Sequence, residues 1–279
     1  MKQLDARRYA ISPGRAPPLR GAVSSAAAYA DIRIAGEDTA APRNLAKRLA
    51  WIERAAPLRG RRVIDCGCGA GAYVAALCAR GADAVGVEHS AEKVAAFARS
   101  HPALAARVQR GDLAALPHAS ASFGAALLNE VLEHAPDELA VLCEIRRVLG
   151  PGGRLIVFSP NRLYPFETHG VIWKRSGRRL APSTPGIPYL PLALGDRWFH
   201  YPARNYWPWQ LRHLIRAAGF RILQRGYVWQ TFENISGRQP ALVRALAPWL
   251  RGAAALGEQL PGIRALGVSQ LLVAEPVGR

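Results

Sequence analysis

The stretch VIDCGCGAGAYV, residues 63–74, decides the fold that this sequence predicts. A β-branched pair opens it, Asp65 follows, and an alanine-rich helical pattern begins at Ala72. Between them stand three glycines at alternate positions, Gly67, Gly69 and Gly71. Glycine permits positive φ and a close backbone approach to a ligand, and a helix N-terminus offers unpaired N–H groups to an anion. The stretch therefore predicts a strand, a ligand-binding turn and a helix.

Two cofactors fit this turn when it is considered alone. The spacing Gly67-x-Gly69-x-x-Ala72 satisfies the loose dinucleotide fingerprint, in which the last small residue lets helix and strand pack closely. The pattern D-x-G-x-G-x-G, which begins at Asp65, resembles motif I of the class I S-adenosylmethionine (SAM) methyltransferases. In that family the loop holds the methionine portion of SAM. A glycine turn without a ligand is the third interpretation.

Apolar strand patterns alternate with helical patterns after this turn. Strands are expected at Ala84–Glu88, Val108–Arg110, Phe123–Asn129 and Arg154–Ser159. This alternation predicts an α/β fold with a doubly wound, mostly parallel sheet. The resemblance to the methyltransferases implies seven strands, the last of them antiparallel. Ligands of such sheets bind at the carboxyl ends of the strands, where several polar side chains are expected: Asp65, Glu88, Asp112, Asn129 and Glu130.

The resemblance covers roughly residues 60 to 162 and includes the runs NEVLEHAPDE (129–138) and LGPGGRLIVFSPN (149–161). Glu88 stands 19 residues beyond Gly69, where a carboxylate accepts hydrogen bonds from both ribose hydroxyls of a nucleoside. That position alone does not separate NAD from SAM. The resemblance implies further SAM contacts in two places, beside the adenine at Asp112 and Leu113, and after the fourth strand at Asn129 and Glu130.

The run Glu130-x-x-Glu133-His134 brings two carboxylates and an imidazole together, a set that can bind a divalent cation. It resembles E-x-x-E-H in the ubiquinone-pathway O-methyltransferases and the small-RNA terminal 2′-O-methyltransferases. There the acids and the histidine, joined by a later histidine, hold a metal that orients the acceptor hydroxyl. The later ligand matches His169 here, with His200 in reserve.

The same run has an interpretation without metal. Many methyltransferases of this superfamily carry E-V-L-E-H as loop contacts. His134 or His169 would then act as the catalytic general base, because neutral imidazole is suited to that role near pH 7. If a metal binds, Mg, Mn, Fe and Zn are the candidates.

The chain divides into four parts along its 279 residues. Residues 1–40 are expected to form a mobile tail or lid, residues 41–160 the SAM-binding core, residues 161–207 a substrate cap, and residues 208–279 the end of the sheet, with a helical insertion at 236–268. The cap segment is rich in aromatic residues, which favours a bulky, partly apolar acceptor: Trp173, Tyr189, Trp198, Phe199, Tyr206 and Trp207.

The chain is strongly basic, with a formal charge of +17. Such a charge suits an anionic partner, but no Lys/Arg block interleaved with aromatic residues marks a nucleic-acid stripe. Nucleic acid is therefore not the favoured partner. Residues 242–266 have apolar positions at helical spacing with arginines between them, which fits a helix lying on a membrane surface or packing on its own domain.

Four cysteines, Cys66, Cys68, Cys78 and Cys143, fall within expected core elements and are expected to be buried thiols of a reducing compartment. A cytoplasmic protein is expected, with peripheral contact at the inner membrane face if residues 242–266 bind lipid. Together these features predict a SAM-dependent methyltransferase acting on a hydroxyl of a small or lipid-like acceptor. The alternatives are a nucleic-acid methyltransferase, an N- or C-methyltransferase, and a non-catalytic or NAD-binding protein of the same fold.

Overall fold

The glycine turn connects the first strand of the central sheet to a helix, as the sequence predicts. The computed structural model describes residues 42–180, 184–233 and 241–278, so the tail expected at residues 1–40 lies outside the described residues. Seven strands form one sheet in the order β3 (Val108–Arg110), β2 (Asp83–Glu88), β1 (Arg62–Cys66), β4 (Phe123–Asn129), β5 (Leu149–Pro160), β10 (Ser269–Pro276) and β9 (Phe220–Val228).

The sheet is parallel except at β10, which is antiparallel to both β5 and β9. This confirms the expected seven-stranded, doubly wound sheet with an antiparallel last strand. In the parallel register Asp65 lies beside Gly86 of β2 and Leu127 of β4. Glu88 lies beside Arg110. The carboxyl ends of these strands therefore meet along one edge of the sheet.

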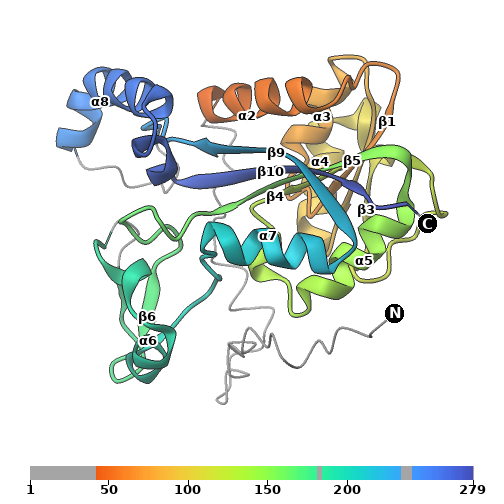
Figure 1. Ribbon diagram of the computed structural model, residues 1–279. Coiled ribbons are helices and arrows are strands. Elements are labelled where there is room, and N and C mark those ends of the chain that lie inside the picture. The colour runs from red at the N-terminus through yellow and green to blue at the C-terminus, as the bar shows by residue number, and fades with distance from the viewer. Residues whose placement is uncertain (1–41, 181–183, 234–240, 279) are drawn as a thin grey trace.

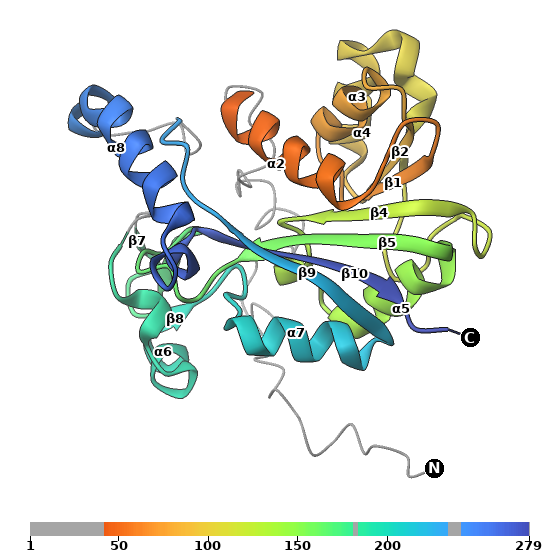
Figure 2. The same ribbon diagram turned by 45° about the horizontal axis from the view of Figure 1, so that its top comes forward.

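Helices cover both faces of the sheet (Figures 1 and 2). One face carries α2 (Pro42–Ala55), α3 (Ala72–Cys78) and α4 (Ala91–Ser100), and the other carries α5 (Glu138–Val148) and α7 (Pro208–Ala217). Successive strand residues point to opposite faces. Leu127 therefore packs in the core under α2, α3 and α4, and Leu128 packs in the core under α5 and α7. Burying one such leucine contributes about 1.5–3 kcal/mol.

The expected cap at residues 161–207 forms a small sheet of its own. Strand β6 (Val171–Trp173) pairs antiparallel with β7 (Arg179–Leu180) and with β8 (Phe199–His200). The short helices η4 (Ile187–Tyr189) and α6 (Leu192–Trp198) complete it. Among the described residues of the cap, the buried core consists of Val171, Ile187 and Phe199.

Three short 3₁₀ turns and one further helix complete the described elements. They are η2 (Pro102–Arg107), η3 (Leu132–His134), α8 (Ala241–Gln259) and η5 (Ile263–Leu266). Helix α8 falls within the helical insertion expected between the last two strands. Among the described residues, no helix combines the length and apolar character that crossing a membrane requires.

The prediction that all four cysteines are buried was wrong. Cys143 on α5 is exposed, and Cys78 on α3 packs half-buried against the core. Pro136 and Asp137 precede α5. Asp137 is the N-cap, and its Oδ1 accepts a hydrogen bond from Ala140 N at 2.9 Å. A short acid at this position satisfies a backbone N–H that the helix leaves unpaired.

Candidate active site

The glycine turn is packed so tightly that side chains are excluded from it. Gly71 has φ of 77°, and an added Cβ would lie 2.2 Å from the ring of Phe97 on α4. Gly67 also has φ of 77°, and its Cβ would lie 2.7 Å from Val131 in the loop after β4. Left-handed backbone at such close contacts requires glycine. The turn is thus fitted against both α4 and the Glu130–His134 loop.

Glu88, at the end of β2, folds its carboxylate over this turn. Its Oε2 accepts a hydrogen bond from Gly69 N at 2.9 Å, and its Oε1 accepts one from Ser90 N at 3.0 Å. The residue is only 4% exposed. Carboxylate oxygens have further lone pairs, so these two bonds leave acceptor capacity for a ligand hydroxyl. The proposed ribose contact stays a prediction.

Asp65, at the end of β1, is buried with its Oδ2 unpaired among the described residues. Burial, and then the negative charge of Glu88, raise the pKa of Asp65 to about 7. An unpaired buried carboxylate favours a cationic partner. The ammonium group of an amino acid such as the methionine part of SAM has that character, so Asp65 fits the expected role.

Asp112 and Leu113 lie after β3, at the same edge of the sheet. Asp112 is exposed, and its Oδ1 accepts a hydrogen bond from Ala114 N at 2.9 Å, which makes a local turn. Leu113 is half-buried against the core. The structure places both where the adenine contact was expected, and the contact itself stays a prediction.

Asn129 and Glu130 are held by an arginine that the sequence analysis did not single out. Arg48 on α2 donates from Nη1 to Oδ1 of Asn129 (2.5 Å), and from Nη2 to Oε1 of Glu130 (2.7 Å) and Oγ of Ser269 (2.8 Å). Burial alone would raise the pKa of Glu130, but the charge of Arg48 and the hydrogen bonds from Ser269 and Arg48 together outweigh it, so the pKa is lowered. Glu130 is therefore an ionised carboxylate with its own cation.

The sequence contains one indication that Arg48 is buried. It lies between Leu45, Leu49 and Ile52, within the apolar stripe of α2. A charge in such a stripe needs a buried partner. Asn44, one turn earlier, is a local partner, but the other three lie 81, 82 and 221 residues away along the chain, so the pattern could not have named those.

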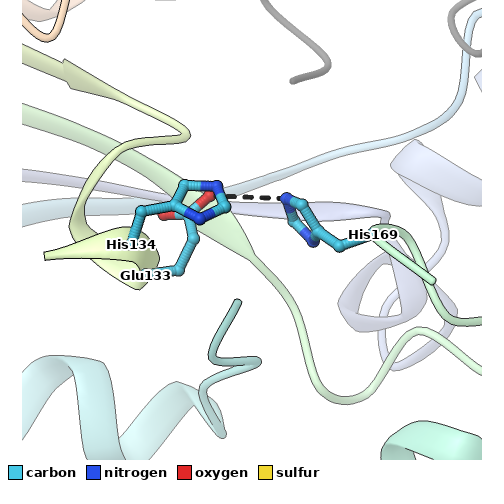
Figure 3. Close-up of side chains that lie close together, drawn as sticks. All are labelled: Glu133, His134 and His169. Carbon is cyan, nitrogen blue, oxygen red and sulfur yellow. Dashed lines mark ion pairs between the residues drawn. The ribbon is translucent and has the colours of Figure 1, made fainter. Parts of the chain in front are cut away.

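Glu133, His134 and His169 come together beyond the end of β4 (Figure 3). One potential ligand atom from each lies within 4.8 Å of the others. The imidazole rings of His134 and His169 are 5.1 Å apart between centroids, and Nε2 of His169 is 4.0 Å from Oε1 of Glu133. No other group of three such residues occurs in the described parts of the chain. His200, the reserve candidate, lies on β8 and is not a member.

Three atoms of this cluster are buried without a hydrogen-bond partner among the described residues, namely both oxygens of Glu133 and Nε2 of His134. His134 Nδ1 lies 3.3 Å from the carbonyl oxygen of Pro202. A carbonyl only accepts, so Nδ1 carries the proton and Nε2 presents its lone pair. Buried polar atoms are normally paired, so the cluster has the character of a ligand site.

Burial sets the protonation of the cluster. It is the largest cause of a pKa well above the ordinary range at Glu133, and the negative charge of Glu130 adds to it. Burial also lowers the pKa of His134 and, together with His134, lowers that of His169 to about 4. Without a ligand, these shifts favour the neutral acid at Glu133 and the neutral imidazole at both histidines.

The end of the cap segment fixes the loop that carries Glu133 and His134. Arg204 donates from its backbone N to the Glu133 carbonyl (3.1 Å) and from Nη1 to the Ala135 carbonyl (2.7 Å). Tyr206 donates its hydroxyl to the Leu132 carbonyl (3.2 Å). Glu167 accepts from the backbone N of His169 at 2.9 Å. The cap thus supplies one member of the cluster and positions the other two.

Comparison with known proteins agrees with this architecture. A family model described as a methyltransferase domain matches residues 64–157. The ubiquinone biosynthesis O-methyltransferase of Paracidovorax citrulli is 37% identical over 182 residues, which cover 63% of this chain and 70% of the relative. The enzyme of the same name from Aromatoleum aromaticum is 34% identical over 186 residues, covering 63% and 71%.

Solved structures share the fold at low identity. An S-adenosylmethionine dependent methyltransferase from Mesorhizobium loti superposes with a TM-score of 0.53 at 19% identity, over 85% of this chain and 97% of the other. The geranyl diphosphate C-methyltransferase of Streptomyces coelicolor, solved with Mg²⁺, geranyl diphosphate and S-adenosyl-L-homocysteine, gives 0.53 at 18%, over 85% and 82%.

The sheet order, the glycine turn and the acids at the strand ends define a SAM-dependent methyltransferase. Within that class, the chain belongs to the family that includes the ubiquinone biosynthesis O-methyltransferases. The interpretation as a non-catalytic or NAD-binding protein of this fold is thereby set aside. The cofactor expected from the D-x-G-x-G-x-G pattern is confirmed as SAM.

Proposed function

We propose that this methyltransferase transfers the methyl group of SAM to a hydroxyl oxygen of a small or lipid-like acceptor, with a divalent metal held by Glu133, His134 and His169. The observation that carries the proposal is the unpaired, buried state of the Glu133 oxygens and of Nε2 of His134. Relatives named as ubiquinone biosynthesis O-methyltransferases support transfer to oxygen.

The donor set fits a divalent cation. One carboxylate and two imidazoles suit Zn, Fe or Mn better than Mg, which prefers oxygen ligands. A cation bound there would orient an acceptor hydroxyl and lower its pKa. Glu130 does not complete this set as the sequence run suggested, because its Oε1 already accepts from Arg48 and Ser269. The oxygen of the acceptor hydroxyl would occupy the coordination position that Glu130 does not fill.

Transfer itself is an in-line displacement at the methyl carbon. The acceptor oxygen forms the new C–O bond while the C–S bond of the sulfonium breaks and its electron pair returns to sulfur. The protein has to align the two partners and exclude water. If no metal binds, Nε2 of His134 is the base for the hydroxyl proton, since its lone pair is free and its pKa is lowered.

Aromatic residues of the cap and of the first turn of α7 support an apolar acceptor. Tyr189, Trp207 and Trp209 stack in sequence, with ring centroids 6.4 and 4.9 Å apart. Trp209 and Tyr189 are exposed at 54% and 44%. Flat aromatic surfaces of this kind favour ring systems or long apolar chains.

The metal is tested by chelation. Enzyme treated with excess chelator is assayed with labelled SAM, and then with Mg, Mn, Fe and Zn added back separately. We expect activity to be lost and then restored by Zn, Fe or Mn. Full turnover in excess chelator would remove the metal from the proposal and leave His134 as the base.

The acceptor is tested by offering labelled SAM with phenolic, lipid, glycan and RNA fractions. Alkali-stable label on a hydroxyl of a phenolic or lipid fraction supports the proposal, and label on nitrogen or carbon contradicts it. RNA is included because of the charge of +17. RNA binding that falls steeply with salt, without transfer, would mark that charge as non-specific.

A further inference from the structure

Helix α8 packs on the protein through its small residues. Ala247, Ala254 and Gly257 are buried, and an added Cβ at Gly257 would lie 2.7 Å from the ring of Trp229. A surface helix of a globular protein normally turns its large apolar residues inward. Among the described side chains of α8, the fully buried positions are instead occupied by alanine and glycine.

Several large apolar residues of α8 point outward instead, whereas Val243 and Leu250 are half-buried. Trp249 is 81% exposed and Leu256 is 59% exposed. Leu246 and Leu260 are also exposed, and the spacing of these four residues places them on one side of the helix. The stripe continues into η5, where Ile263 and Leu266 are exposed. An apolar stripe of this length facing water marks an interaction surface.

The segment that carries this stripe has a positive net charge. Residues 241–268 contain three arginines, Arg244, Arg251 and Arg264, and a single acid, Glu258. That acid forms an ion pair with Lys47 and accepts a hydrogen bond from Trp229 N, so it belongs to the joint between α8 and the body. Within residues 241–268 no other acid opposes an anionic partner.

The stripe lies at the end of the molecule that carries the candidate site. Figures 1 and 2 both show α8 and the cap at the end of the sheet where β4 and β5 terminate. The cap exposes two further large aromatic residues, Trp173 at 42% and Trp198 at 47%. Indole rings favour the boundary between lipid and water, because they combine an apolar body with a polar N–H.

We infer that α8, with η5, is a peripheral docking surface for an anionic lipid bilayer. Apolar side chains would enter the boundary between headgroups and acyl chains, and the arginines and the overall charge would attract anionic headgroups. A second copy of the chain is a poorer occupant, because it would bring another charge of +17 against the first. The inference concerns binding and does not depend on the identity of the acceptor.

Co-sedimentation of the full chain with vesicles tests this surface. One set of vesicles is phosphatidylcholine alone and the other contains phosphatidylglycerol in equal part. We expect binding to the second set only, reduced by salt. The triple variant Leu246→Ser/Trp249→Ser/Leu256→Ser should bind at least about tenfold more weakly. Leu223→Ser is the matched control, since Leu223 on β9 is 44% exposed and Leu246 is 43% exposed.

Tryptophan emission gives a second measurement. Subtracting the emission spectrum of Trp249→Phe from that of the wild type isolates the emission of Trp249. This emission should be that of a water-exposed indole without vesicles and should shift to the blue with anionic vesicles. Undiminished binding of the triple variant, or failure of the wild type to bind anionic vesicles, would overturn the inference. So would two other results: a self-association that the triple variant abolishes, which would assign the surface to a second copy, or Trp249 emission shielded before vesicles are added, which would assign it to the chain's own residues.

Discussion

Arg48 and Glu130 form a buried ion pair between the first described helix and the loop after β4, with Nη2 and Oε1 2.7 Å apart. Arg48 and Glu130 are both only 3% exposed. The arginine also binds Asn129 and Ser269, so one side chain joins α2, β4 and β10 at the candidate site. A buried ion pair therefore joins these three elements at the edge of the sheet where the candidate site lies.

Removing the cation of this pair should destabilise the fold severely. Arg48→Met would leave Glu130 buried and ionised, and we expect about 3–5 kcal/mol lower free energy of unfolding in urea. The double variant Arg48→Met/Glu130→Gln should recover part of this loss, because it removes both charges. Arg54→Met, an exposed arginine of the same helix, is the control. If the loss of free energy of unfolding in the double variant equals the sum of the losses in Arg48→Met and Glu130→Gln, the two residues do not form a pair.

Asp65 should make stability depend on pH. Its pKa is raised from 3.8 to about 7, so between these values the folded protein holds a proton that the unfolded chain has lost. The free energy of unfolding should therefore fall as pH rises from 4 to 7 through this group. Asp65→Asn removes that contribution, and above pH 7 it should be more stable than wild type by a few kcal/mol at most.

The same substitution should weaken SAM binding, since the neutral amide no longer attracts an ammonium group. Thermal unfolding across the pH range and calorimetry with SAM are the two measurements. A parallel profile for Asp65→Asn and wild type would show that Asp65 keeps its ordinary pKa.

Metal binding should release a proton. Burial raises the pKa of Glu133 well above its ordinary range, which favours a protonated carboxyl whose proton a bound cation would displace. Affinity should rise with pH, and calorimetry of Zn binding in two buffers of different ionisation enthalpy should show about one proton released per ion at pH 7. Glu133→Gln should abolish the release and weaken binding, whereas His200→Asn should change neither. Binding without proton release would contradict this assignment.

Glu88→Ala should weaken SAM binding by about 10- to 100-fold, because the Gly69 and Ser90 N–H groups lose their acceptor and the glycine turn its support. Glu88→Gln keeps one acceptor oxygen and should fall between. The control is His89→Ala, whose exposed ring contacts the same carboxylate from outside. If both Glu88 variants and His89→Ala bind SAM with the affinity of the wild type, Glu88 is excluded from the cofactor site.

Comparing Gly71→Ala with Gly152→Ala separates the cost of positive φ from the cost of a steric clash at the glycine turn. Gly71 and Gly152 both have positive φ, 77° and 68°, but only at Gly71 would the new methyl group meet a neighbour, Phe97. We expect Gly152→Ala to cost about 1–2 kcal/mol of stability, and Gly71→Ala to cost about 1–3 kcal/mol more from the clash. Chemical unfolding of both variants measures the difference. Equal losses would mean that Phe97 moves aside freely.

The sequence was informative wherever a local pattern has a single structural consequence. The glycine turn, the strand-end acids Asp65 and Glu88, and the alternation of strands and helices all predicted correctly where these residues lie. The histidine chosen for the metal cluster, His169, does lie beside Glu133 and His134. Its position followed from the resemblance rather than from any spacing, since it lies 35 residues beyond His134.

What the sequence could not supply depends on long-range packing. Ser269 reaches Glu130 across 139 residues, and nothing in its neighbourhood marks it. The cap sheet has strands of two or three residues, too short to show a period of two. The fifth strand was expected at Arg154–Ser159, yet β5 already begins at Leu149, because Leu149 pairs with Phe123 before the register shifts.

The position of β10 also bears on how this protein is made. The strand enters the sheet between β5 and β9, and Leu271, Leu272, Val273 and Ala274 are nearly inaccessible to water. A nascent chain leaves the ribosome from its N-terminus. The sheet therefore keeps an open slot beside β5 until about residue 276 has emerged. Folding should be completed only after most of the chain has been synthesised, and a ribosome stalled before residue 269 should carry a chain that chaperones still recognise.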